Sequence, residues 1–497
     1  MILSLVERTL PAMRRGILTA PQSAGVVEVR LDCLPRGGRG RLAWLFDGSP
    51  RPILATCRPR SQAGLYAGSE SARTDLLMEA VRAGASWLDI EMGSKAQTLA
   101  DALADTSGVR IILSHHDAKG WPRGARALRR RMRRVRGVAA HKIIGTARRP
   151  ADLLRVHRFL QGQAGRAQEL TAFCMGGAGT MSRVAATHWG SWASYACAQR
   201  GQEAAPGQIS LEEMERVYRP DEIDDETRWA ALIGSPITHS VSPAMHNAAY
   251  AAQGINFRYV PMEITTASGL ADLRPLCRAL RLRGFSVTAP WKVSMARRVD
   301  RLEPAARQIG AVNTVVWDGR RMLGFNTDVT GATSALEEVL GSAGRRLEGL
   351  RVAIVGAGGS ARAVAHGASQ GGAQVLVAAR RPAEAARLAR AVGGTSCRIA
   401  DLVRRDYDVL VNATPVGTSG GRTALPVPAR AVRGLLVFDL VYNPPETALL
   451  RLARKRRILT LNGLEMVVRQ AAEQHTLFTG HEPPLDVMRE AARAALK

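Results

Sequence analysis

Residues 351–361 read Arg-Val-Ala-Ile-Val-Gly-Ala-Gly-Gly-Ser-Ala, and this stretch decides the fold of the second half of the chain. A buried apolar strand, 351–355, runs directly into a glycine turn. A helical stretch then continues towards Gln370, and a second strand covers 373–379. Glycines in such a turn let the backbone approach a pyrophosphate that sits on the helix N-terminus. The pattern predicts a Rossmann-type βαβ unit whose cofactor contacts are Gly356, Ala357, Gly358, Gly359, Ser360 and Ala361.

The end of the second strand selects the nucleotide. An NAD site carries Asp or Glu there to accept a hydrogen bond from the ribose 2′-hydroxyl, but this chain has Ala379, Arg380 and Arg381. Two guanidinium groups suit a 2′-phosphate instead. We therefore predict NADP(H) as the cofactor, with Arg380 and Arg381 as ligands.

The first half of the chain has another periodicity. Short β-branched runs alternate with helical patterns over about 215 residues, which is typical of a (β/α)₈ barrel. The runs are 2–6, 26–30, 52–58, 87–91, 110–116, 141–146, 170–175 and 190–196. Such barrels carry their chemistry at the C-terminal ends of the strands. The polar residues at those ends are Glu28, Arg30, Arg58, Glu91, His116 and Lys142, with Arg183 after the seventh strand.

The chain length and the distribution of charge indicate more than one domain. The chain has 497 residues, too many for one core. An acidic stretch at 221–226 interrupts an otherwise basic sequence, and we place the linker there. We predict an α/β protein with a barrel at 1–222, a substrate-binding domain at 228–330 completed by C-terminal helices at 463–497, and an NADP-binding domain at 331–462.

Lysine is almost absent from this basic chain. The formal charge is +26, yet 63 cations are arginine and only six are lysine: Lys95, Lys119, Lys142, Lys292, Lys455 and Lys497. Arginine stays protonated, whereas a lysine can lose its proton and attack a carbonyl. The retained lysines are therefore candidates for chemistry.

Composition excludes several classes. No apolar run reaches 18 residues, and Glu7 and Arg8 fall within the first ten, so we expect neither a membrane span nor a signal peptide and predict a cytoplasmic protein. The cysteines form no C-x-x-C pair, so we expect no bound metal. Residues 123–136 hold eight arginines, but Leu128, Met132 and Val135 form a buried stripe beneath a solvated arginine face. Nucleic-acid binding is not predicted.

Motifs in the second half follow one another in a specific order. They are 234–243, His246-Asn247, 287–292, 310–314, 326–328, 412–417, 439–444 and 463–466 with Gln470. This set closely resembles shikimate dehydrogenase over 229–497. The resemblance implies that Lys292 and Asp328 form the catalytic dyad and that Ser240 and Ser242 hold the substrate carboxylate. It further implies substrate contacts from Thr288, Asn313, Tyr442 and Gln470, and cofactor contacts from Thr414, Gly463 and Met466.

The residue types fit that chemistry, since hydride transfer to a ring ketone needs a cation or acid beside the developing alkoxide. The chain departs from the family at two places. Ser286 replaces the usual Asn, as in plant-type fused enzymes, and Ala379-Arg380-Arg381 replaces Asn-Arg-Thr.

The first half resembles type I 3-dehydroquinate dehydratase over about 1–220. The matching stretches are 28–32, 56–58, 89–91, 114–117, 141–143, 175–176, 182–183 and 205–208. A buried lysine can form an imine that acts as an electron sink, and a histidine can move the protons. The resemblance implies that Lys142 forms the imine and His116 is the acid/base, because His115 points to the other side of its strand. It also implies that Arg183 holds the carboxylate and that Glu28, Arg30, Arg58 and Gln208 shape the site.

Two departures affect this half as well. Gln62 stands where the family has a Glu that orients the histidine, and Ala204 stands where it has Ser. We predict a fused enzyme that dehydrates 3-dehydroquinate and reduces 3-dehydroshikimate with NADPH; its partners are small anionic substrates. Two alternatives stay open: a quinate or shikimate dehydrogenase that works oxidatively with a weak or repurposed barrel, and a regulatory or nucleic-acid-associated protein with an inactive barrel.

Overall fold

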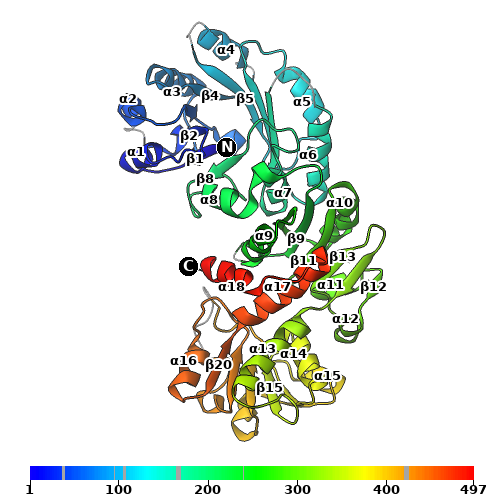
Figure 1. The fold of residues 1–497 in the computed structure, drawn as a ribbon. Helices are drawn as coiled ribbons and strands as arrows, with labels where there is room; N and C mark the ends of the chain where they lie inside the picture. Colours follow the sequence, from blue (N-terminus) through cyan, green and yellow to red (C-terminus); the bar gives the residue numbers. More distant parts are fainter. Residues whose placement is uncertain are drawn as a thin grey trace. The chain divides into compact units, whose positions relative to one another are not determined.

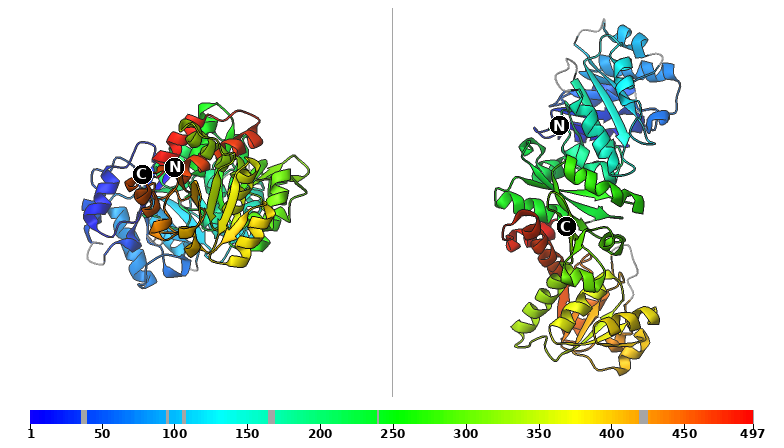
Figure 2. Two further views of the ribbon diagram at one scale, coloured as in Figure 1. Left: turned by 90° about the horizontal axis from the view of Figure 1, so that it is seen from below. Right: turned by 90° about the vertical axis from the view of Figure 1, so that its right-hand side faces the viewer.

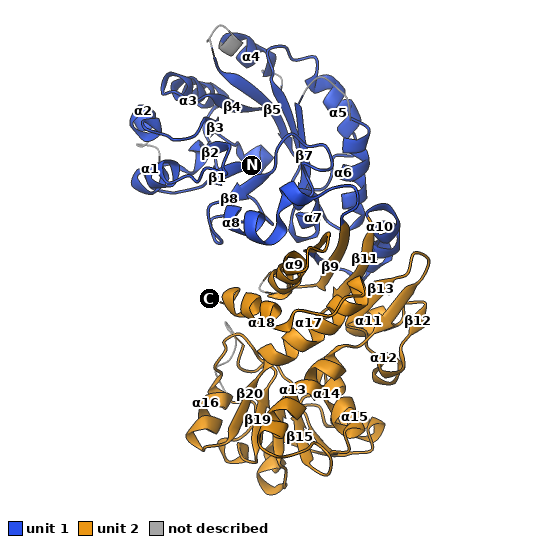
Figure 3. Ribbon diagram, in the orientation of Figure 1, with its two compact units in different colours: residues 1–227, 260–280 blue, residues 228–259, 281–497 orange. Residues whose placement is uncertain are grey.

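The computed structural model describes residues 1–35, 40–93, 96–104, 108–163, 169–238, 240–418 and 425–496. Lys95, His239 and Lys497, which belong to the lysine set and the 234–243 motif, lie outside these ranges. The chain forms two compact units: unit 1 is 1–227 with 260–280, and unit 2 is 228–259 with 281–497 (Figure 3). Among the described helices, none has the length and apolar character needed to cross a membrane.

Unit 1 contains a parallel eight-stranded sheet in the order β7-β6-β5-β4-β3-β2-β1-β8 (Figure 1). Its strands are β1 Ile2–Leu5, β2 Val26–Arg30, β3 Ile53–Thr56, β4 Trp87–Glu91, β5 Arg110–His116, β6 Ala140–Thr146, β7 Glu169–Met175 and β8 Tyr195–Cys197. Helices alternate with them: α1 Leu10–Leu18, α2 Leu42–Phe46, α3 Glu70–Arg82, α4 Ala96–Ala104, α5 Ala125–Met132, α6 Ala151–Gln161, α7 Thr180–Val184 and α8 Leu211–Glu213. The predicted (β/α)₈ class is confirmed.

The eighth strand differs from the predicted 190–196. Gly190 has a φ of +102°, and the residues after it connect to β7 instead of forming a strand. The N–H of Trp192 donates to the carbonyl of Leu170 (2.8 Å), and the Ser191 hydroxyl accepts from the N–H of Ala172 (2.9 Å). Residues 191–192 thus connect to β7, the strand at the opposite end of the sheet order from β8, and β8 begins only at Tyr195.

Alternation along the strands places an apolar layer beneath a polar one. Ile2, Leu54, Trp87, Ile112 and Ala140 share a buried cluster at the strand starts. Two residues further along each strand, inward-facing positions are polar, because successive side chains point to opposite faces. This second layer contains Ser4, Glu28, Thr56, Asp89, Ser114 and Lys142, all buried.

One expectation about unit 1 was wrong. The arginines of α5 were predicted to be solvated, but Arg129 is only 2% exposed and its guanidinium contacts the imidazole of His141 on β6. The helical period explains this, since Arg129 lies four residues after buried Ala125 and three before buried Met132. It therefore occupies the inward face of the helix.

Unit 2 holds most of a mixed six-stranded sheet in the order β10-β9-β11-β13-β14-β12. The strands are β9 Arg228–Gly234, β10 Phe257–Glu263, β11 Leu282–Val287, β12 Arg301–Leu302, β13 Thr314–Trp317 and β14 Met322–Phe325. The connecting helices are α9 Ser242–Ala252, α10 Leu273–Ala279, α11 Lys292–Ala296, α12 Pro304–Ile309 and α13 Asp328–Ser342. In unit 2, α17 Gly463–Thr479 packs on α13 and α18 Leu485–Ala494 packs on α9.

The second sheet of unit 2 is fully parallel, in the order β17-β16-β15-β18-β19-β20 with helices beside it (Figure 2). Its strands are β15 Arg351–Val355, β16 Gln374–Ala378, β17 Thr395–Cys397, β18 Val409–Asn412, β19 Leu436–Asp439 and β20 Leu459–Asn462. Helices α14 Gly359–Gln370, α15 Pro382–Ala391 and α16 Ala448–Lys455 connect them. The predicted Rossmann topology is confirmed. The strand order reverses between β15 and β18, where such sheets bind ligands.

Candidate active sites

Lys142 lies in the polar layer of the barrel, on β6. Its side chain is buried, with the residue only 4% exposed. The Nζ donates to the Asp89 carboxylate at 3.1 Å, lies 3.7 Å from the Glu28 carboxylate and sits 3.8 Å above the Tyr195 ring. The two carboxylates and the aromatic face hold the ammonium in place, and the lysine must lose a proton before it can attack a carbonyl.

Arg58 holds the acidic groups of this site in place. Its guanidinium donates to Asp89 at 2.7 and 3.0 Å, to Glu91 at 2.7 Å and to the Ser114 hydroxyl at 2.8 Å. Burial alone would raise the pKa of Asp89, but the charges of Arg58 and Lys142 bring that pKa below its usual value. Asp89 is therefore a carboxylate in the resting site. Asp89 was not among the predicted site residues, although the Asp-Ile-Glu stretch at 89–91 was a signal.

His116 ends β5, and its neighbours decide its charge. Burial and the cations of Arg58 and Lys142 bring the pKa of His116 well below its ordinary value, so the imidazole is neutral. Its Nδ1 is buried and has no hydrogen-bond partner among the described residues. Gln62 does not bond the ring: its Oε1 accepts from the backbone N–H of His116 at 2.9 Å. The chain thus fixes the strand end at His116 without a carboxylate on the imidazole.

The anion-binding candidate of the barrel is Arg183, on α7. It is 1% exposed, donates through Nη1 to the carbonyl of Tyr195 (3.0 Å) and lies 4.5 Å from the Phe173 ring. Its Nε and Nη2 are buried without acceptors in the described structure. Burial lowers the pKa of Arg183 to about 10. Two unused N–H groups on one guanidinium suit a carboxylate that accepts both.

The other barrel candidates are paired within the protein. Arg30 donates to both oxygens of Asp32, at 2.7 and 2.9 Å, and at 3.4 Å to the carbonyl of Ala204. Gln208 accepts from the N–H of Ala204 at 2.7 Å. These contacts bring Arg30 and Gln208 to the same loop. Glu28 accepts hydrogen bonds from the hydroxyls of Ser4 and Thr56, and its carboxylate lies 3.7 Å from the Lys142 Nζ.

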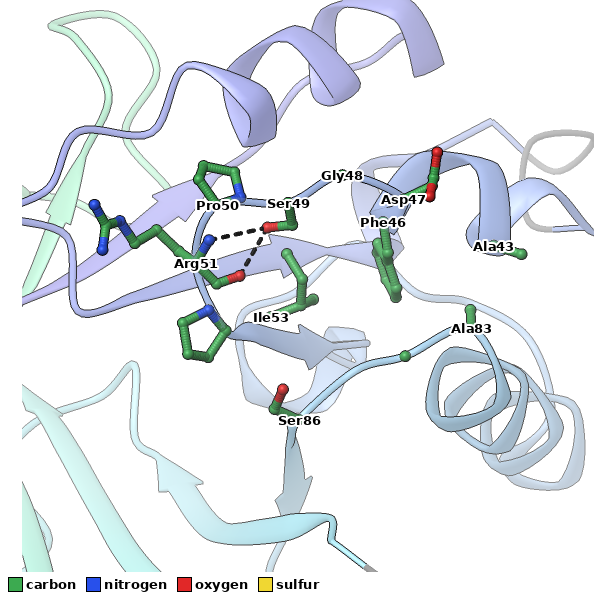
Figure 4. Close-up of a pocket in the computed structure, with 12 residues that line it drawn as sticks. Ala43, Phe46, Asp47, Gly48, Ser49, Pro50, Arg51, Ile53, Ala83 and Ser86 are labelled. Atoms are coloured by element: carbon green, nitrogen blue, oxygen red, sulfur yellow. Dashed lines mark hydrogen bonds between the residues drawn. The ribbon is translucent and has the colours of Figure 1, made fainter.

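A hollow of about 540 Å³ lies at the other end of the strands (Figure 4). It is lined by residues 46–53, before and at the start of β3, and by Ala83, Gly84 and Ser86, just before β4. Barrel enzymes place chemistry at the C-terminal strand ends, so this hollow is not the active site.

In unit 2, Lys292 at the start of α11 pairs with Asp328, the first residue of α13. Asn313 donates at 2.8 Å to the other Asp328 oxygen, and at 3.4 Å to Gln470. The Thr327 N–H donates to Asn313 at 2.8 Å and fixes the amide orientation. The structure thus brings together four of the predicted site residues: Lys292, Asp328, Asn313 and Gln470.

The remaining substrate candidates lie on neighbouring elements. Ser240 donates to the Ser242 hydroxyl at 3.2 Å, beside the N-terminus of α9. Tyr442 packs against the buried cluster that contains Val241, between those serines in sequence. The N–H of Thr288 donates to the carbonyl of Ile233 at 2.9 Å, which places Thr288 beside the end of β9.

Ser286 reveals a residue that sequence analysis missed. Its hydroxyl donates to Gln474 Oε1 at 2.7 Å, and Gln474 Nε2 donates to the Thr314 hydroxyl at 2.9 Å. Gln474 lies one helical turn after Gln470 on α17, so the i, i+4 spacing of two glutamines was an available signal.

The nucleotide crevice forms where β15 and β18 end. Gly356 has a φ of +123°, and a Cβ there would lie 2.9 Å from the carbonyl oxygen of Ala413, so only glycine fits. Beside it, Thr414 donates to Asn412 at 2.7 Å. A Cβ on Gly359 would lie 3.6 Å from the Lys292 side chain. The glycine turn, with Ala357, Gly358, Ser360 and Ala361, therefore adjoins the Lys292–Asp328 pair.

The other cofactor candidates differ among themselves. Arg381 is exposed and pairs with Glu384 at 2.7 Å, whereas exposed Arg380 makes no hydrogen bond or ion pair within the described residues. Gly463 follows β20, and a Cβ there would lie 2.0 Å from the carbonyl oxygen of Leu440. Met466 belongs to the buried cluster of the parallel sheet, so its contacts in this structure are with the core.

Comparison with known proteins covers almost the whole chain. The bifunctional 3-dehydroquinate dehydratase/shikimate dehydrogenase of Arabidopsis thaliana is 33% identical over 485 residues, covering 93% of this chain and 79% of the relative. The chain belongs to this bifunctional dehydratase/dehydrogenase family.

Both halves of the bifunctional enzyme are matched separately. Family models match as type I 3-dehydroquinase (1–225), shikimate dehydrogenase substrate binding domain (232–315), NADP oxidoreductase coenzyme F420-dependent (351–418) and shikimate 5′-dehydrogenase C-terminal domain (463–493). A shikimate dehydrogenase (NADP(+)) of Archaeoglobus fulgidus is 42% identical and covers 54% of this chain and 99% of its own. The shikimate 5-dehydrogenase of Thermus thermophilus, solved with NADP(H) and shikimate, has a TM-score of 0.50 at 36% identity; the match covers 54% of this chain and all of that one.

Proposed function

We propose that unit 1 dehydrates 3-dehydroquinate through an imine on Lys142 and that unit 2 reduces the product, 3-dehydroshikimate, to shikimate with NADPH. The observation that carries this is that two of the few lysines, Lys142 within β6 and Lys292 at the start of α11, each lie beside a carboxylate in a different unit. In this proposal 1–222 is the dehydratase, 228–330 with 463–497 binds shikimate, and 331–462 binds NADP.

The dehydratase step begins at Lys142. Its neutral amine attacks the ring ketone, and loss of one water gives an imine that draws electrons from the neighbouring C2. Asp89, at 3.1 Å from Nζ, orients the amine, and the ammonium proton leaves to solvent before the attack. Neutral His116 removes the acidified C2 proton and returns a proton to the C1 hydroxyl, which leaves as water. A second water hydrolyses the imine and restores the lysine, so the balance is one water lost.

Arg183 orients the substrate in this reaction. Its free Nε and Nη2 bind the substrate carboxylate. Gln208 in the 204–208 loop, and Arg30 beside this loop, contact the substrate hydroxyls. Arg58 keeps Asp89 anionic and holds both Asp89 and Glu91 in place.

In unit 2, Lys292 stands ready to give a proton to the ketone oxygen. Asp328 orients it, Asn313 and Gln470 bind hydroxyls, and Ser240 and Ser242 hold the carboxylate near the start of α9.

NADP fits the residues that are present. Gly356 has no Cβ, nothing lies within 4 Å of a Cβ built on Gly358, and exposed Arg380 makes no hydrogen bond or ion pair within the described structure. Gly356–Ala361 and Thr414 would hold the pyrophosphate side, and Arg380 with Arg381 the 2′-phosphate. When bound, the cofactor supplies a hydride.

A one-pot assay tests the whole proposal: wild-type protein, 3-dehydroquinate and NADPH should give shikimate with no second enzyme. Borohydride should trap a covalent adduct with the wild type and none with Lys142→Ala. Lys292→Ala should abolish reduction while NADPH binding persists. A wild type that traps no adduct contradicts the barrel assignment, and loss of NADPH binding in Lys292→Ala contradicts the placement of that lysine.

The oxidative alternative is separated by kinetics. The proposal expects NADPH over NADH and shikimate over quinate; faster turnover with quinate, and no trapped adduct, would favour the alternative. A cytoplasmic location stays a prediction, since the Arabidopsis relative is named as chloroplastic.

A further inference from the structure

A segment from beyond the barrel sequence packs within unit 1. Residues 260–280 lie inside the stretch that the substrate-binding-domain model matches, 232–315, yet they belong to the same compact unit as the barrel. Within this unit α10 packs against α6 (Figure 3). A Cβ on Gly269 would lie 3.4 Å from the ring of Pro150 at the start of α6. Residues 1–222 alone therefore do not complete unit 1.

Asp272 makes the polar contacts of this segment. Its residue is 7% exposed, and its Oδ2 accepts from the Ala151 N–H at 3.0 Å and from Arg149 Nε at 2.7 Å. The other oxygen accepts from Arg149 Nη2. Helix α6 begins at Ala151, and its N-cap residue Pro150 makes no side-chain cap bond. Because a helix N-terminus leaves N–H groups unsatisfied and favours negative charge, Asp272 takes the role of the missing cap.

The capped end of α6 is connected to the proposed dehydratase site through the backbone. Residues 147–150 join β6, which carries Lys142, to α6. The N–H of Ala147 donates to the carbonyl of Met175 at 2.9 Å, and the next residue, Gly176, donates to Pro206 at 2.8 Å. Pro206 lies in the 204–208 loop that carries Gln208.

A second residue of the segment supports the same loops. A Cβ on Gly177 would lie 2.5 Å from Glu263 Oε2, so Glu263 packs directly on the turn that follows β7. The 260–280 segment therefore touches two consecutive loops at the catalytic end of the barrel, and the second of them, after β7, bonds the 204–208 loop.

We propose that Asp272 is a positioning residue for the dehydratase: it fixes the loop after β6 and, through Met175 and Gly176, holds the 204–208 loop over the substrate. This inference rests on the proposed activity of the barrel. Lys142 and His116 lie in the sheet itself, so loosening the loop weakens substrate binding and leaves the chemical step in place.

The test is Asp272→Asn in the full-length chain. We expect KM for 3-dehydroquinate to rise about tenfold, with kcat within about twofold of wild type, because the amide keeps one oxygen but removes the negative charge from the bonds to both Ala151 and Arg149. Amide hydrogen exchange should accelerate in peptides covering 147–154 and 204–208. Dehydrogenase constants measured on the same sample should not change, which shows that unit 2 remains folded.

Two further variants keep the inference testable. Arg149→Gln attacks the pair from the barrel side and should raise KM about threefold, because the bond from Ala151 to Asp272 remains. Asp318→Asn is the matched control: Asp318 accepts from the backbone N–H groups of Arg320 and Arg321 in the turn between β13 and β14. It should leave both activities unchanged.

Unchanged KM in Asp272→Asn overturns the inference, even if exchange accelerates at 147–154, because Asp272 is then a structural cap only. A fall in kcat with constant KM overturns it as well. If the wild type itself does not dehydrate 3-dehydroquinate, the proposed function fails. In that case, unaltered amide exchange at 204–208 in Asp272→Asn still contradicts the claim that Asp272 holds the 204–208 loop, and faster exchange there supports it.

Discussion

Arg183→Met is expected to stabilise unit 1 while it removes substrate binding. The guanidinium is 1% exposed, has one hydrogen bond, to Tyr195, and carries two N–H positions without acceptors in the described structure. No carboxylate pairs with it among the described residues. A buried cation without a counter-ion destabilises the folded state unless a ligand supplies the negative charge.

The magnitude follows from the pKa of Arg183, which burial lowers from its ordinary value to about 10. At about 1.4 kcal/mol per pH unit, the charged form is disfavoured in the fold by ~3 kcal/mol. Because the folded pKa lies below the unfolded one, this penalty is complete below pH 10 and disappears at more alkaline pH, where the unfolded chain also loses the proton. Methionine loses the Tyr195 bond and the contact with the Phe173 ring, about 1 kcal/mol each, so the net gain in unfolding free energy is about 1 kcal/mol.

Urea-dependent hydrogen exchange in peptides from β6 and β7 measures this gain in unit 1 separately from unit 2. In the same variant, KM for 3-dehydroquinate should rise at least about a hundredfold, as expected when a bidentate carboxylate contact is removed. The control is Arg73→Met: Arg73 is equally buried but pairs with Glu70 and Glu91, so its loss should destabilise unit 1 by about 3 kcal/mol. Destabilisation by Arg183→Met of more than about 1 kcal/mol, or wild-type substrate binding, would refute the reasoning.

Further predictions concern pH and cofactor choice. The dehydratase kcat/KM should stay flat from about pH 8 to pH 6, because the pKa of His116 is lowered. Gln62→Glu adds a carboxylate that favours the imidazolium, so the acid limb of the variant's pH profile should move to higher pH. A variant profile that coincides with the wild-type profile contradicts this. Burial and His475 lower the pKa of His246 to about 3, so unit 2 should lose about 2 kcal/mol of unfolding free energy between pH 6.5 and pH 5 through this group, and His246→Phe should remove that loss in denaturant titrations. Arg380→Ala should raise KM for NADPH about tenfold without changing KM for NADH, whereas Arg381→Ala, whose arginine already pairs with Glu384, should have the smaller effect; equal effects would contradict the distinction.

Local pattern sufficed for much of the fold. The strands at 26–30, 87–91, 110–116 and 351–355 have the predicted bounds, because each is a β-branched run bounded by turn residues. The first inward polar layer also follows from alternation, which is why Glu28 and Lys142 were predicted as neighbours at one end of the barrel. Prediction was weaker for β8, where Gly190 and Ser191 close the ring through bonds to a distant strand.

The roles of individual side chains depended on partners that are far away in sequence. Gln62 stands where the family has a Glu that orients the histidine, but the loop after β3 brings its side chain to the backbone N–H of His116. Arg129 was expected in solvent, but the helix turns it towards His141. Asp89 and Gln474 gained importance only when folding placed them beside Lys142 and Ser286.

The sequence by itself determined the two fold types, the preference for NADP and the two lysines, because repeat periodicity, a glycine turn and the scarcity of lysine are properties of the chain. Only the tertiary structure decided which charges meet: Arg58 holding Asp89, Arg183 left without an acid among the described residues, and Asp272 capping a barrel helix. The physical reason is range. Periodicity acts over a few residues, whereas desolvation and ion pairing depend on groups that come together only when the whole chain is folded.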